Sequence, residues 1–98
     1  MDSYYFVLEV EPQPDNSMIG HVSRAVGHIW VTSAEMEEAR EKVLQFLKSE
    51  HWSVTEEKKA YVPAPEEIAD LQGEDLSNYQ EAQTKGFNAK FYYWHRSE

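Results

Sequence analysis

Apolar and polar residues alternate over the first third of the chain in the pattern of two β-strands. Residues 4–11 predict one strand, and a second is expected over about residues 21–32. Alternate positions of the first strand form an apolar face made of Tyr4, Phe6, Leu8 and Val10. Residues 12–17 contain two prolines, an aspartate and an asparagine, which favour a turn. The two strands should therefore pair as an antiparallel hairpin with a long loop.

Apolar residues then recur at helical spacing, which predicts an amphipathic helix over residues 34–50. The apolar stripe of this helix consists of Met36, Ala39, Val43, Phe46 and Leu47, with Leu44 beside it. Thr32 or Ser33 can serve as the N-cap, and Thr32 with Glu35 has the spacing of a capping box. Acidic residues near the start and Lys48 near the end suit the helix dipole.

The second half of the chain predicts a strand, a weaker helical region and a last strand. Residues 52–62 form either one long strand or a small hairpin, because the charged residues 56–59 interrupt the apolar pattern. Two short helices or one kinked helix, interrupted at Gly73, should follow and end at Gly86 as the C-cap. Their apolar stripe consists of Ile68, Leu71, Leu76, Tyr79 and Ala82.

Residues 87–95 predict the last strand, with aromatic residues on both faces. One face carries Phe87, Ala89, Phe91, Tyr93 and His95. The other face carries Lys90, Tyr92, Trp94 and, just beyond, Arg96. An exposed sheet face of this kind favours contact with a partner, because tyrosine and tryptophan bury much area at little entropic cost. Tyr92 and Trp94 are therefore candidate partner-binding residues, and a homodimer through the sheet is a further expectation.

The order of elements predicts a single α+β domain over residues 1–98, of the type ββαβ(αα)β. We expect a four-stranded, mostly antiparallel sheet with the helices packed on one face. This two-layer sandwich is similar to the ferredoxin-like family in composition, although that family has the order strand, helix, strand, strand, helix, strand. The resemblance concerns architecture alone.

Composition excludes several classes of function. The chain has no cysteine, which excludes disulfide frameworks, thiolate metal sites and thiol catalysis. Its 18 acidic residues against 9 Lys and Arg give a net charge of −9, which disfavours binding to nucleic acid or to anionic lipid. The sequence has neither a signal-peptide pattern nor a membrane-length apolar run, so a cytoplasmic protein is expected.

Acidic residues are concentrated in residues 65–84, and no Lys or Arg occurs between Ala60 and Thr84. The acids of this segment are Glu66, Glu67, Asp70, Glu74, Asp75 and Glu81. A solvated helical face explains many such runs. The alternative is a docking surface for a basic region of another protein, because exposed charges steer association. Among these acids, the first five are candidate partner-binding residues.

Signals for catalysis are weak. None of the four histidines has a partner at metal-motif spacing, and nucleophile motifs and phosphate-binding loops are missing, so no metal or cofactor is expected. The preferred hypothesis is therefore a small, acidic, non-catalytic interaction or regulatory module of the inhibitor, immunity or adaptor type. An alternative is a small-ligand-binding or small enzyme-like sandwich, in which His28, Trp30 and Tyr61 line a pocket beside sheet aromatics.

Overall fold

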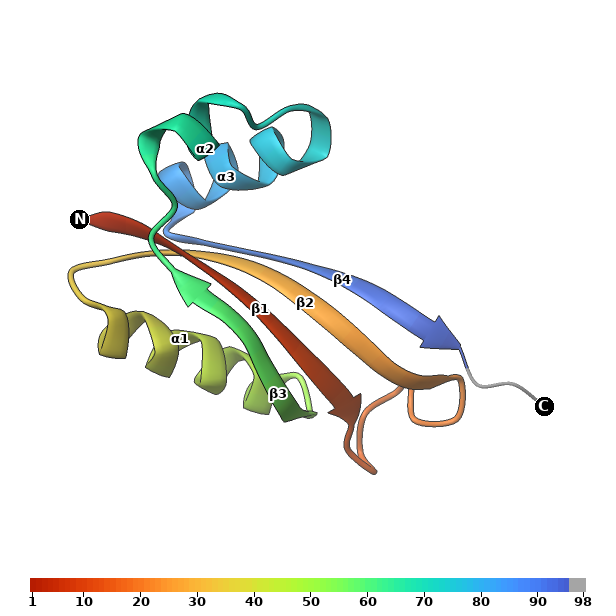
Figure 1. The fold of residues 1–98 in the computed structure, drawn as a ribbon. Helices are drawn as coiled ribbons and strands as arrows, with labels where there is room; N and C mark the ends of the chain where they lie inside the picture. The colour runs from red at the N-terminus through yellow and green to blue at the C-terminus, as the bar shows by residue number, and fades with distance from the viewer. Residues whose placement is uncertain (96–98) are drawn as a thin grey trace.

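Four strands form one antiparallel sheet in the computed structural model, which describes residues 1–95. The elements, in chain order, are β1 (Asp2–Pro12), β2 (Val22–Ser33), α1 (Met36–Ser49), β3 (Trp52–Tyr61), α2 (Pro65–Ala69), α3 (Gly73–Lys85) and β4 (Phe87–His95). The strand order across the sheet is β3-β1-β2-β4, so the predicted β1–β2 hairpin forms its centre (Figure 1). The α+β class and the four-stranded antiparallel sheet are thus confirmed.

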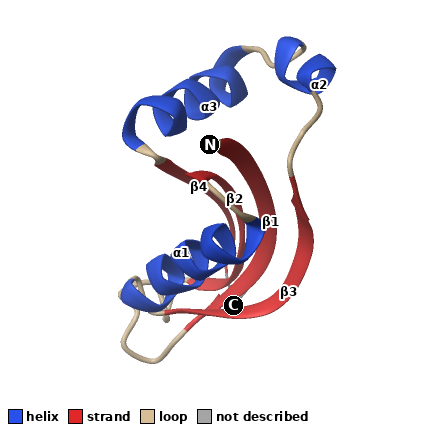
Figure 2. Ribbon diagram, turned by 90° about the vertical axis from the view of Figure 1, so that its left-hand side faces the viewer, coloured by secondary structure: helices blue, strands red, loops and turns tan. Residues whose placement is uncertain are grey.

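The main core lies between α1 and one face of the sheet. The alternate residues predicted for β1 are all buried there, and Phe6 and Leu8 are among the largest side chains enclosed. From α1, Val43 and Leu47 pack against the same cluster, which also includes Ile29 of β2. The curved strands wrap around α1 in Figure 2. The period-2 and helical patterns therefore identified the two surfaces that meet in this core.

The helices do not all cover one face, so the expected two-layer arrangement is wrong. Helix α3 contacts side chains of the face opposite α1: the Tyr79 ring lies 5.1 Å from the Trp30 ring, and the Glu74 carboxylate lies 2.7 Å from Lys90 Nζ. Figure 1 shows α1 on one side of the sheet, and α2 and α3 on the other at one end. The reason lies in the strand order. Strands β3 and β4 form the two opposite edges of the sheet, so the chain between them must cross one sheet face. Because α1 already covers one face, α2 and α3 cross the other.

The two edge strands differ. Residues 52–61 form one long strand rather than a hairpin, but its register against β1 shifts twice, which leaves Thr55 and Lys58 without opposite partners. Its charged middle is exposed, and bulges and charges both discourage further strand pairing. Strand β4 pairs with β2 without any bulge of its own, and its outer edge is free of proline and acidic residues. The predicted Arg96 lies outside the described residues.

Of the two predicted helix caps, one is wrong and one is confirmed. The capping box predicted before α1 does not form: β2 continues through Ser33, Glu35 is the N-cap, and no side chain caps the helix. Thr32 instead donates its hydroxyl to the Ala82 carbonyl of α3 at 3.0 Å. The glycine C-cap of α3 is confirmed, because Gly86 has φ 88° and donates its N–H to the same carbonyl at 2.7 Å. These contacts fix α3 against the sheet.

Candidate functional site

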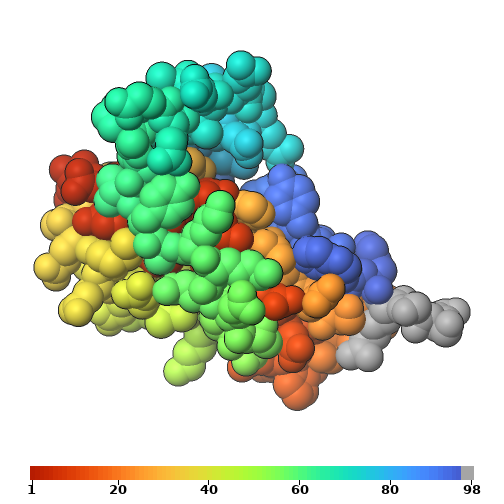
Figure 3. Space-filling model, viewed as in Figure 1, coloured from red at the N-terminus to blue at the C-terminus, as the bar shows by residue number. Residues whose placement is uncertain are grey.

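The sheet face opposite α1 has a covered end and an open end. Helices α2 and α3 cover the end at which β3 finishes and β4 begins (Figure 1). In the space-filling view of Figure 3, the surface of β1 and β2 is visible between β3 and β4, below the block formed by α2 and α3. The acidic helices and the aromatic sheet face were predicted as separate surfaces. They adjoin on one side of the molecule.

A cavity of about 140 Å³ lies where the helices meet the sheet. Its lining combines three aromatic rings, two carboxylates and two further apolar side chains: Tyr5, Trp30, Tyr61, Glu67, Asp75, Pro63 and Leu71. Among residues 1–95, no Lys, Arg or His contributes to this lining. The structure thus brings together Trp30 and Tyr61, which were predicted as pocket residues, with two acids of the predicted docking surface.

The three rings of the cavity are held in a fixed arrangement by the sheet. Tyr5 and Trp30 are direct cross-strand partners, and their ring centroids lie 4.6 Å apart. Tyr5 and Tyr61 are also direct partners, with centroids 6.1 Å apart and planes at 84°. The Tyr79 ring packs edge-on against Trp30, which is only 5% exposed. These rings are therefore positioned by strand register rather than by mobile loops.

His28 lies behind Tyr5 and does not line the cavity. The Tyr5 hydroxyl and His28 Nδ1 are 2.5 Å apart, and the Tyr92 ring packs edge-on against His28 at 5.2 Å. Burial lowers the pKa of His28, and burial together with the Asp75 charge raises the pKa of Tyr5 to about 12. His28 is therefore neutral near pH 7, and its hydrogen bond with the Tyr5 hydroxyl fixes the Tyr5 ring.

The two carboxylates of the cavity have different surroundings. Glu67 accepts hydrogen bonds from the Tyr61 hydroxyl at 3.1 Å and from the Ala64 N–H at 3.4 Å. Burial, followed by the contact with Glu67, raises the pKa of Tyr61. Asp75 acts on Tyr5 through its charge, and it forms no ion pair within residues 1–95. Together they give the cavity a negative potential with aromatic walls.

The other acids of the predicted docking surface do not form one uniform patch. Glu74 pairs with Lys90 across α3 and β4, and Glu81 pairs with Lys85 at 3.0 Å. Glu66 and Asp70 lie exposed on and just after α2. Two of the acids are therefore neutralised by Lys85 and Lys90, which follow the acidic segment in the chain. The acids of α2 and of the cavity have no such lysine partner among residues 1–95.

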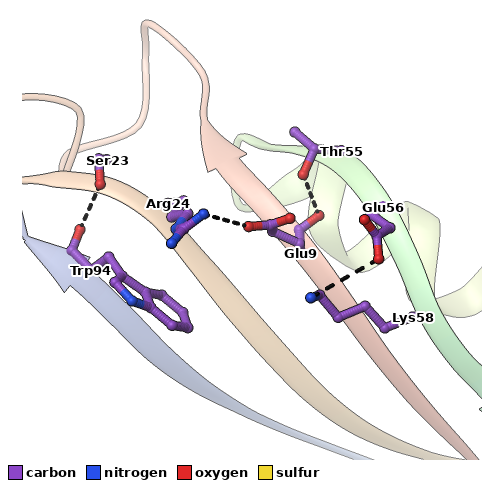
Figure 4. Close-up of polar contacts among 7 residues, drawn as sticks. All are labelled: Glu9, Ser23, Arg24, Thr55, Glu56, Lys58 and Trp94. Atoms are coloured by element: carbon purple, nitrogen blue, oxygen red, sulfur yellow. Dashed lines mark hydrogen bonds and ion pairs between the residues drawn. The ribbon is translucent and has the colours of Figure 1, made fainter.

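The open end of the face carries a row of side chains that crosses all four strands (Figure 4). The Arg24 guanidinium lies 5.0 Å from the Trp94 ring and 3.2 Å from Glu9 Oε1. Tyr92 and Trp94, which were predicted as partner-binding residues, are 48% and 43% exposed. Arg24 and Glu9 form a surface ion pair of small energetic value. The row thus presents aromatic surface with little net charge.

Sequence reasoning missed Tyr5, Pro63 and Leu71 as cavity residues. Tyr5 could have been predicted. It lies on the second face of β1, and the expected hairpin with β2 pairs it with Trp30. Pro63 and Leu71 carry no comparable signal, since their place depends on which sheet face the helices cover.

Comparison of the chain with protein-family models, with curated proteins and with solved structures finds no match. Among residues 1–95, no group of three or more His, Asp or Glu side chains is arranged to hold a metal ion. None of the helices in that range is long and apolar enough to cross a membrane. The geometry of the sheet face is therefore the basis for the function proposed below.

Proposed function

We propose that the protein is a non-catalytic interaction module that binds a basic segment of a partner protein on the sheet face opposite α1. The observation that carries this proposal is that an aromatic surface and an acidic surface lie on the same side of the sheet. Exposed Tyr92 and Trp94 provide aromatic area on β4, and the acidic helix α3 contacts the same strand through Glu74 and Lys90. Aromatic surface supplies binding energy, while the charge selects a basic partner and speeds its approach.

Binding fits the site better than catalysis. The Tyr5–His28 pair beside the cavity has shifted pKa values that keep the proton on Tyr5 at neutral pH. A general acid or base works best with a pKa near the working pH, which is far from about 12. Glu67 is likewise engaged in two hydrogen bonds. The groups are arranged to hold a shape rather than to exchange protons.

Selection of displayed peptides against the immobilised protein tests this function. We expect enriched peptides to contain Lys or Arg next to aromatic or aliphatic residues, and their affinity to fall as salt rises. The double variant Tyr92→Ser with Trp94→Ser removes the exposed rings without touching the core around α1, and it should weaken binding at least about tenfold. The matched control is Leu44→Ser, which removes an exposed apolar side chain on α1.

Two results would count against the proposal. One is a selection that enriches no basic peptide above background. The other is a set of peptides that bind the wild type and the double variant equally, because such peptides use another surface.

A second candidate function is the binding of a small molecule in the cavity. The aromatic lining and the two carboxylates favour it, but a volume of about 140 Å³ is well below the ~300–1,000 Å³ of sites for drug-sized ligands. A nucleotide or an extended cofactor is too large, so the cavity accepts a single small group.

A further inference from the structure

We infer that the cavity under α2 and α3 is an aromatic cage for an alkylated ammonium group. This inference rests on the proposed function, in which the cage holds the cationic end of a side chain from the partner's basic segment. The same chemistry occurs in a methylated lysine and in a free quaternary ammonium compound, and the experiments below separate the two sources.

The ring arrangement is suited to a cation. Tyr5, Trp30 and Tyr61 line one small space, and the Tyr5 and Tyr61 rings stand at 84° to each other. A cation attracts the negative faces of aromatic rings, most strongly that of tryptophan, and walls formed by several rings are the usual way to recognise quaternary ammonium groups. Because strand register positions all three rings, little ordering is needed when a ligand enters.

The charge at the cavity has the required sign. Glu67 and Asp75 contribute two carboxylates, and within the part of the chain that the structure describes no basic residue lines the space. The negative field of Asp75 already reaches the Tyr5 hydroxyl, where it helps to raise the pKa to about 12. A neutral ligand of the same shape gains nothing from this field, so charge should dominate selectivity.

The size and the apolar part of the lining favour an alkylated cation over a bare one. A cavity of about 140 Å³ has more room than a bare ammonium, an ion of about the size of a water molecule, can fill. The carboxylates of Glu67 and Asp75 attract any cation, but only alkyl groups also gain apolar contact with Pro63 and Leu71.

The test is a titration of the full chain, labelled with nitrogen-15, with tetramethylammonium chloride at constant total chloride. Binding is followed by NMR through the indole N–H of Trp30, assigned with the variant Trp30→Phe. We expect saturable shifts of this signal at millimolar ligand, as befits a five-atom ligand. Choline should act similarly, whereas 3,3-dimethylbutan-1-ol, its neutral analogue, should bind at least about fivefold more weakly.

Two variants examine the lining residues. Asp75→Asn keeps the shape and removes the charge, and Tyr61→Leu removes a half-buried ring at the last residue of β3. Each should weaken tetramethylammonium binding about fivefold or more. Asp70→Asn is the matched control, because it removes the same charge from the same segment outside the cavity lining. Tyr61→Phe keeps the ring and should retain binding, which separates loss of the cage from loss of folding.

The inference is overturned if tetramethylammonium causes no saturable shift at Trp30. It is also overturned if the neutral analogue binds equally well, or if Asp70→Asn has the same effect as Asp75→Asn. A peptide from the selection above, made with lysine or with trimethyllysine, separates the sources of the group. Tighter binding of the trimethyllysine form, lost in Asp75→Asn, supports a protein side chain as the ligand.

Failure of this inference is distinguishable from failure of the proposed function. Peptides that bind through Tyr92 and Trp94 with no response to tetramethylammonium at Trp30 would uphold the interaction module and remove the cage. Tetramethylammonium binding in the absence of any selected basic peptide would uphold the cage as a site for a free ammonium compound and remove the interaction module.

Discussion

Substitution of Gly86 by alanine tests whether the turn between α3 and β4 depends on a left-handed backbone. Gly86 has φ 88°, and a Cβ added there would meet nothing within 4 Å. Any loss of stability must therefore come from the backbone conformation and not from a clash. The turn cannot easily relax, because the Gly86 carbonyl accepts the N–H of Thr32 at 3.1 Å and its own N–H is bound to Ala82.

The expected size of the effect follows from the cost of that conformation. A non-glycine residue in the left-handed region costs roughly 1–2 kcal/mol. For a domain of this length, 1 kcal/mol shifts the Tm by roughly 4–8 °C, so Gly86→Ala should lower the Tm by about 5–15 °C. Gly20 is the matched control: it is equally open, and its φ is not in the left-handed region. Gly20→Ala should be neutral or slightly stabilising.

Thermal and urea unfolding, both followed by circular dichroism, measure the two variants against the wild type. The reasoning is refuted if Gly86→Ala unfolds at the wild-type midpoint, or if Gly20→Ala loses as much stability. Semisynthesis offers a further check, because D-alanine at position 86 favours positive φ and should restore or exceed wild-type stability.

Two predictions concern the pH dependence of the site. The folded pKa of His28 is lowered, so protonation favours the unfolded chain, and stability should fall as pH drops below about 6.5. His28→Gln should flatten this fall in urea midpoints measured from pH 8 to pH 5, whereas His21→Gln, at an exposed position, should keep the wild-type slope. An unchanged slope in His28→Gln would contradict the assignment of a neutral, partly buried ring. The pKa of Tyr5 is raised from 10.0 to about 12, so the folded state keeps a proton that the unfolded chain loses, and stability should fall between these pH values. Tyr5→Phe should reduce that alkaline loss and remove the tyrosinate absorbance step near pH 12, and a step that persists would show that another tyrosine produces it.

The sequence was sufficient to predict the strands, the helices and the alternation of faces. Phe6 and Leu8 are buried as their spacing requires, and Phe87 and Phe91 pack on the same core while Tyr92 lies on the other face. These features are local, because side-chain direction follows directly from the period of the element.

The position of the second helical region could not be predicted in the same way. The apolar stripe of α2 and α3 is weak, and Ala82 is its one fully buried residue. Both faces of the central hairpin carry large apolar residues at this end, so Phe6 and Tyr5 give a helix comparable surfaces on either side. The choice depends on the strand order, which places β3 and β4 at opposite edges, and periodicity contains no information about that order. The cavity was missed for the same reason.

The unequal edges of the sheet limit how copies of this protein can associate. Bulges and charged side chains close the β3 edge, whereas the β4 edge still offers backbone donors and acceptors. Two molecules joined through their β4 edges about a two-fold axis would use both open edges and leave the closed β3 edges outermost. Assembly by strand addition would then end at a pair, because the bulged and charged β3 edges offer a third copy no regular edge.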